Sequence, residues 1–80
     1  MAKTTFAVLI TTPSNILFQG TASSMIVPGE EGTFEMLPLH RPLVSRLVDG
    51  EITVDDKTFS IRRGAIRIAD DIVTAVVEIP

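Results

Sequence analysis

Apolar and polar residues alternate along most of this chain, in short segments that turn residues separate. The period of two is clearest at 51–54, 58–61 and 65–69, and residues 4–11 are rich in β-branched and aromatic side chains. Such alternation predicts β-strands that bury one face. No apolar stretch longer than one turn follows helical spacing. A helix over 37–48 is excluded because it would contain Pro38 and Pro42.

Turn residues recur at intervals of roughly eight to ten residues. This spacing predicts an all-β sandwich or barrel of about eight to ten short strands. Gly20, within an apolar stretch, predicts a bulge or bend at which the chain crosses between sheets. Pro28-Gly29 predicts a type II turn, and Asp49-Gly50 predicts a β-hairpin. Further turns are expected at Asp55-Asp56, Arg62-Arg63-Gly64 and Asp70-Asp71.

Length and composition indicate one ordered domain over residues 1–80. The chain has 80 residues, of which 45% are hydrophobic and 21% charged, enough apolar surface for a small core. A net charge of −3 argues against a nucleic-acid partner, which normally requires a dense positive patch. The absence of cysteine excludes disulfides, thiolate metal sites and cysteine nucleophiles.

Hydrophobic segments near the N-terminus are short. The run from Phe6 to Ile10 has five residues, whereas a secretory core needs roughly 7–15 and a membrane-spanning helix about 20. We therefore expect a soluble, cytoplasmic chain without direct membrane insertion, which reaches a membrane only through a partner.

His40 is the only histidine and the first candidate for acid–base chemistry. A hydrolase would require an orienting carboxylate and a nucleophile near it, and Glu35 and Ser45 are the nearest in sequence. No nucleophile motif accompanies them. The preferred interpretation is that His40 orders its proline-flanked loop through a backbone hydrogen bond, or contacts a partner protein.

The acidic motifs indicate turns rather than ligand sites. The segment 29–32 (Gly-Glu-Glu-Gly) lacks the lysine and hydroxyl of a phosphate loop, and its glutamates would repel phosphate. Asp55-Asp56 and Asp70-Asp71 are adjacent pairs, which lack the alternating ligand spacing of a calcium loop. We expect no metal, no cofactor and no catalytic residue.

Arg62, Arg63 and Arg67 form the only local basic cluster, and alternation allows Arg63 and Arg67 to share a sheet face. A solvated face and a site for an acidic protein partner fit this cluster equally well.

Five landmarks together resemble the epsilon subunit of F-type ATP synthase. They are Phe18 to Gly20, the run 27–34 (VPGEEGTF), the run 36–43 around His40, Asp49 to Ile52, and Ile61 to Gly64. The resemblance covers nearly the whole chain. It implies a flattened β-sandwich of short, mostly antiparallel strands in one epsilon-like domain, 1–80.

The resemblance also implies a function without catalysis. Epsilon domains of this kind belong to the rotor's central stalk, between the gamma subunit and the c-subunit ring, during proton-driven ATP synthesis or hydrolysis. It implies a place on the cytoplasmic face of the bacterial inner membrane, peripheral through the complex. The expected ring-contact residues are Glu31, Gly32, Thr33, Glu35, His40, Arg41 and Pro42.

Three positions in this region depart from the family pattern. Glu35 and Leu39 replace glycines, and Arg41 replaces a small residue. Glycine permits positive φ or close backbone approach, so these replacements affect the expected ring contact. The chain ends at Pro80, where the sandwich should end, so we expect neither the C-terminal helical hairpin of typical bacterial members nor an ATP site. The alternative function is a stand-alone β-sandwich that binds a peptide or carbohydrate.

Overall fold

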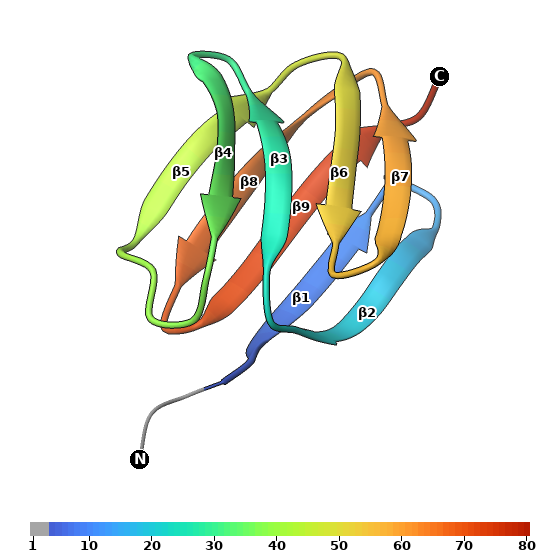
Figure 1. Cartoon of the computed structure of the whole chain (residues 1–80). Helices are drawn as coiled ribbons and strands as arrows, with labels where there is room; N and C mark the ends of the chain where they lie inside the picture. Colours follow the sequence, from blue (N-terminus) through green and yellow to red (C-terminus); the bar gives the residue numbers. More distant parts are fainter. Residues whose placement is uncertain (1–3) are drawn as a thin grey trace.

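The computed structural model describes residues 4–80, which form nine β-strands and no helix (Figure 1). The number of strands agrees with the predicted eight to ten. The strands are β1 (Phe6–Thr11), β2 (Ile16–Ala22), β3 (Met25–Gly29), β4 (Gly32–Met36), β5 (Leu43–Leu47), β6 (Gly50–Val54), β7 (Lys57–Ile61), β8 (Arg63–Ala69) and β9 (Ile72–Glu78).

The strands form one curled sheet that folds into two layers (Figure 1). The front layer has the order β4-β3-β6-β7, and the back layer has the order β5-β8-β9-β1-β2. The layers are joined at one corner, where Gly29 of β3 pairs with Leu47 of β5. All pairs are antiparallel except β1–β9, which is parallel. The predicted all-β sandwich of mostly antiparallel strands is confirmed.

Between the layers lies a core made only of apolar side chains. In β9, Val73, Ala75 and Val77 are buried, whereas Ile72 and Val76 between them are exposed. This is the alternation expected of strands with one face on the core. None of residues 4–80 buries a polar or charged side chain. At the open side of the sandwich, the rings of Phe18 in β2 and Phe59 in β7 meet edge to face, 6.0 Å apart.

The Asp49-Gly50 hairpin prediction is wrong. Instead of turning back, the chain passes from β5 in the back layer to β6 in the front layer. Backbone bonds hold this corner: the amide of Val48 donates to the carbonyl of Pro28 at 2.9 Å. Gly50 has a φ of 157°, and a Cβ there would lie 3.0 Å from Pro28 Cβ. Glycine is therefore needed because the backbone at position 50 passes close to Pro28, and not because the chain forms a hairpin there.

The predictions of a bulge or bend at Gly20 and of a type II turn at Pro28-Gly29 are also wrong. Gly20 lies in regular pairing opposite Val8, and the bulge of this strand pair falls between Ile10 and Thr11. Pro28-Gly29 belongs to β3, and the turn falls on Glu30-Glu31 because Gly29 pairs directly with Gly32. Gly32, with a φ of 128°, provides the conformation that glycine favours.

The prediction of a turn at Arg62-Arg63-Gly64 is wrong as well, since only Arg62 separates β7 from β8. Its amide donates to the carbonyl of Glu78 at 2.7 Å while the chain passes between layers.

Both aspartate pairs are confirmed as two-residue turns. Asp70 and Asp71 have φ values of 52° and 58°, the sign that a type I′ hairpin requires.

Candidate functional site

The expected ring-contact residues lie on β4, an edge strand, and on the two connections that flank it (Figure 1). Glu31 lies in the β3–β4 turn, Gly32 and Thr33 begin β4, and Glu35 lies near its end. His40, Arg41 and Pro42 belong to the β4–β5 connection. Glu31 and the residues His40 to Pro42 therefore lie beyond opposite ends of β4, which spans roughly 13–17 Å at 3.3 Å per residue. The fold brings these residues onto one edge, but not to one end of it.

A shallow hollow of about 270 Å³ opens at the Glu31 end, between β4 and β5. Half-buried Phe34 and Leu43 pack against the core beside it, and Glu30 and Glu31 lie at its border. An apolar floor beside two carboxylates can accommodate the stem and the charge of a partner's basic side chain. Its lining residues are Gly29, Glu30, Glu31, Gly32, Phe34, Leu43, Val44 and Ser45.

The β4–β5 connection begins with a tight turn from Leu37 to His40, whose amide donates to the Leu37 carbonyl at 3.2 Å. Pro38 occupies its first central position and Leu39 its second, with a φ of 69°. This is the pattern of a type II turn, in which the second central position favours glycine. Leu39 stands where the family resemblance expects glycine, and it adopts the positive φ that this turn position requires.

His40 orders its own loop, as the preferred interpretation predicts. Its Nδ1 lies 2.7 Å from the carbonyl oxygen of Arg41 and donates to it, since a carbonyl can only accept. The hydroxyl of Ser45 donates to the carbonyl of Arg46 at 3.0 Å. Across residues 4–80, no hydrogen bond joins His40 to Glu35 or Ser45. The arrangement therefore does not assemble the acid–base pair and nucleophile of a hydrolase.

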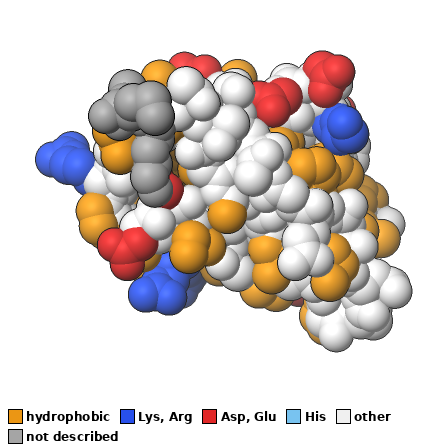
Figure 2. All heavy atoms as spheres, turned by 90° about the horizontal axis from the view of Figure 1, so that it is seen from below, with side chains coloured by type: hydrophobic (Ala, Val, Ile, Leu, Met, Phe, Trp, Pro, Cys, Tyr) orange, Lys and Arg blue, Asp and Glu red, His pale blue; other side chains and the backbone are white. Residues whose placement is uncertain are grey.

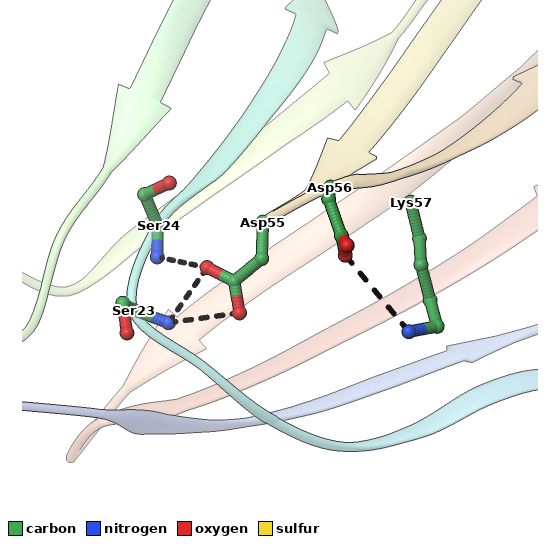
Figure 3. A network of polar contacts seen from close by, with 5 residues as sticks. All are labelled: Ser23, Ser24, Asp55, Asp56 and Lys57. Atoms are coloured by element: carbon green, nitrogen blue, oxygen red, sulfur yellow. Dashed lines mark hydrogen bonds and ion pairs between the residues drawn. The ribbon is translucent and has the colours of Figure 1, made fainter.

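Asp55 ties two loops together (Figure 3). Its Oδ1 accepts hydrogen bonds from the amides of Ser23 and Ser24, at 3.0 and 3.1 Å. Asp56 instead approaches Lys57 at 3.9 Å on the exposed surface. The carboxylates of Asp55 and Asp56 thus have different partners and do not form one site. Sequence reasoning identified the turn but missed the bond, because Ser23 lies 32 residues away and no local pattern links it to Asp55.

Neither a metal centre nor a spanning helix emerges within residues 4–80. No group of three or more histidine, cysteine, aspartate or glutamate residues could hold a metal ion there. The same part of the chain contains no helix long and apolar enough to cross a membrane. Seen from below, charged side chains lie along the left and the top of the view, and hydrophobic ones are spread over its middle and right (Figure 2).

The three arginines of the predicted cluster do not share one surface: two lie on the outer face of β8, and one lies at the corner between β7 and β8. Arg63 and Arg67 lie on the same outer face of β8, with Ala65 between them, as alternation predicts. Arg63 Nε donates to Glu78 Oε2 at 3.0 Å. Arg62 lies at the corner between the layers. Arg46 of β5, opposite Ala65, adds a third charge to this face that the sequence cluster did not include.

Residues 5–79 match the family model described as "ATP synthase, Delta/Epsilon chain, beta-sandwich domain". An ATP synthase epsilon chain from a Nitratiruptor species is 36% identical over 74 residues, which are 86% of this chain and 57% of that protein. The epsilon chain of Leptospira borgpetersenii serovar Hardjo-bovis is 35% identical over 75 residues, 89% of this chain and 59% of that one. The present chain thus spans less than two thirds of the length of these relatives.

Two solved structures with the same fold come from mitochondrial ATP synthases. A chain in the central stalk and c-ring structure from Tetrahymena thermophila has a TM-score of 0.75 and 16% identity, covering 98% of this chain and 66% of that one. A chain in the OSCP/F1/c-ring structure from Euglena gracilis has a TM-score of 0.82 and 18% identity, covering 96% and 52%. At these identities the structures establish the fold alone. None of the relatives described supports the alternative of a peptide- or carbohydrate-binding module.

Proposed function

This chain belongs to the ATP synthase delta/epsilon chain beta-sandwich family, and we propose that it is a non-catalytic subunit of the synthase's central stalk. In this role it couples the gamma subunit to the c-subunit ring while protons drive ATP synthesis, or while ATP hydrolysis drives the reverse. The family match over residues 5–79 carries the proposal. The chain needs no cofactor for this function.

The packing of the domain suits a part that transmits torque. Its apolar core forms one continuous cluster between the two layers. Backbone hydrogen bonds from Val48 to Pro28 and from Arg62 to Glu78 join the layers at their corners. Asp55 and Asp71 hold two of the connecting loops through backbone amides. A preformed domain of this kind loses little conformational entropy when it assembles with partners.

For the ring contact, we propose the β4 edge with its two flanking connections. The Glu31 end offers carboxylates and a hollow, and the Arg41 end offers a cation on a proline-flanked loop. Glu31 would therefore favour a basic residue of a ring loop, and Arg41 an acidic one. Charge reversal tests each connection: Glu31→Arg and Arg41→Glu should each weaken ring binding, and a reversal without effect would exclude that connection from the contact.

The domain is placed at the membrane only through the complex. As an ATP synthase subunit it is peripheral to a membrane-bound assembly, and we place it on the cytoplasmic face of the bacterial inner membrane. Fractionation should recover it with membranes that contain the synthase. Membranes stripped of the synthase should not retain it.

Reconstitution tests the function directly. The 80-residue chain is added to synthase that lacks its epsilon subunit, and ATP-driven proton pumping into vesicles is measured with ATP hydrolysis in parallel. A coupling subunit should restore pumping per ATP hydrolysed. Failure to bind gamma at micromolar concentration, together with no recovery of pumping, would refute the proposal.

A further inference from the structure

The β4–β5 connection is tied to the body of the domain by a side chain from a distant turn. The amide and the ring of His40 bond only to carbonyls within the connection, those of Leu37 and Arg41. The bond that leaves the connection joins the amide of Leu39 to Oδ1 of Asp71, in the β8–β9 turn, at 2.7 Å. Within the part of the chain that the structure describes, no other hydrogen bond from this connection reaches a different element.

Asp71 is itself held in the back layer. Its backbone carbonyl accepts a hydrogen bond from the amide of Ala7, in β1, at 2.9 Å. Pairing of Ala69 with Ile72 closes the turn on either side of it. Its φ of 58° lies in the left-handed region, which aspartate tolerates. The acceptor therefore has a fixed position, to which the connection between the layers is attached.

The turn from Leu37 to His40 has two alternative forms that share its closing hydrogen bond. The φ of the second central residue is about +80° in type II and about −90° in type I. The forms differ mainly by rotation of the peptide between the central residues, Pro38 and Leu39, so the Leu39 amide points in opposite directions in the two. With a φ of 69°, Leu39 is in the type II form. Because the left-handed conformation costs free energy for a residue with a Cβ, leucine by itself favours type I.

The carboxylate of Asp71 favours the opposite form. The Leu39 amide points at Asp71 in the type II turn, and rotation of the peptide would aim the carbonyl of Pro38 there instead. A carboxylate accepts a hydrogen bond from an amide, whereas a carbonyl oxygen has none to give. A hydrogen bond to an ionised acceptor is also stronger than one between neutral groups. The conformational preference of Leu39 and the charge of Asp71 therefore oppose each other, and in the observed turn the charge prevails.

The form of the turn determines what the connection presents to a partner. The side chain of Leu39 is 67% exposed and directly precedes His40. Rotation of the peptide would redirect this side chain and reverse the Pro38 carbonyl. It would also release the connection from the β8–β9 turn, because the bond to Asp71 would be lost.

We propose that Asp71 is a positioning residue for the ring contact: it selects the type II form of the turn and so holds the connection in the conformation that binds. The inference rests on the proposed function, under which His40, Arg41 and Pro42 contact the c-subunit ring. When only a fraction of the molecules has the competent form, the apparent dissociation constant rises by the inverse of that fraction. Asp71 thus acts on binding through the Leu39 amide.

Nuclear magnetic resonance of the isolated chain measures the form of the turn without any partner. The nuclear Overhauser effect between Pro38 Hα and the Leu39 amide proton is strong in type II and weak in type I, because rotation of the peptide changes this distance. We expect a strong effect in the wild type and in Asp71→Asn, whose side-chain oxygen still accepts a hydrogen bond. Asp71→Gly should give a weak effect. Asp70→Gly is the matched control, with a φ of 52° in the same turn, and should give a strong one.

Proton pumping measures the consequence for the contact. Each variant is titrated into synthase that lacks its epsilon subunit, and the concentration that restores half of the pumping is compared with the affinity for purified gamma. We expect Asp71→Gly to require about three- to tenfold more protein at unchanged gamma affinity. Asp71→Asn and Asp70→Gly should stay within about twofold of the wild type.

A glycine at position 39 separates selection of the turn form from a general loss of stability. Leu39→Gly removes the cost of the left-handed conformation, so the turn should remain type II without the carboxylate. Adding Asp71→Gly to Leu39→Gly should therefore change the half-restoring concentration by less than about twofold. This double-mutant cycle isolates the coupling between the two residues.

The results separate this inference from the stalk function. If the wild type restores pumping but Asp71→Gly keeps the strong Overhauser effect, or loses pumping equally in both backgrounds, the positioning role is wrong while the stalk function stands. If the wild type neither binds gamma nor restores pumping, the stalk function is refuted and the positioning role with it.

Discussion

The carboxylate of Asp71, in the β8–β9 turn, accepts a hydrogen bond from the backbone amide of Leu39, with 2.7 Å between Oδ1 and N. The two residues are 32 positions apart in sequence. The bond fixes the β4–β5 connection, which carries His40 and Arg41, to the end of the back layer. The loop proposed to contact the ring is thus positioned by an acidic turn that sequence reasoning interpreted only as a turn.

Leu39→Gly should raise the free energy of unfolding by about 0.5–1 kcal/mol. Leu39 has a φ of 69° and an exposed side chain, so glycine removes a backbone cost of roughly 1–2 kcal/mol and sacrifices little packing. The greater freedom of glycine in the unfolded chain offsets part of the gain. Urea denaturation measures the difference. Leu37→Gly is the matched control, since Leu37 is also exposed but lacks positive φ, and it should lower stability.

Asp71→Gly should be less stable than Asp70→Gly by about 1 kcal/mol. Both residues have positive φ in the same turn, so glycine relieves the backbone equally at each position. Only the change at Asp71 removes the acceptor of the Leu39 amide, a bond to a charged group near the surface. Equal stabilities in urea would show that the bond contributes nothing.

Asp55→Gly should lower the free energy of unfolding by about 1 kcal/mol. It removes the acceptor of two backbone amides, and the relief of a φ of 52° offsets part of that loss. The amides of Ser23 and Ser24 should then exchange with deuterium faster than in the wild type. Asp56→Ser is the control: its side chain is 91% exposed and its ion pair with Lys57 is long, so stability should change little.

Gly64→Ala should destabilise the domain by about 1–3 kcal/mol. A Cβ at this position would lie 2.5 Å from the carbonyl oxygen of Val76, and backbone must move to accept it. Gly20→Ala provides the comparison, because the nearest atom there is a ring carbon of Phe18 at 3.4 Å, an ordinary contact. We expect Gly20→Ala to be neutral or slightly stabilising. Thermal unfolding of both variants checks the contrast.

The sequence predicts part of the arrangement around the candidate site. The resemblance selected the residues of the β4 edge, and the backbone bond of His40 agrees with the interpretation made from its proline-flanked loop. The sequence pattern does not predict that β4 separates Glu31 from Arg41. Motifs that are adjacent in sequence suggest a single end of the molecule, whereas β4 runs between them and carries residues 40–42 away from Glu31.

The sequence by itself determined the strands, because burial of one face imposes a period of two on side chains wherever a strand forms, as from 65 to 69. It also determined the two aspartate turns, since aspartate tolerates positive φ. Only the tertiary structure decided that Gly50 lies at a corner between layers and that Asp55 and Asp71 bond to distant amides. The tertiary structure alone placed Arg46 opposite Ala65, on the same outer face as Arg63 and Arg67. These relationships depend on which strands become neighbours, and that choice is made by the packing of the whole core rather than by any local pattern.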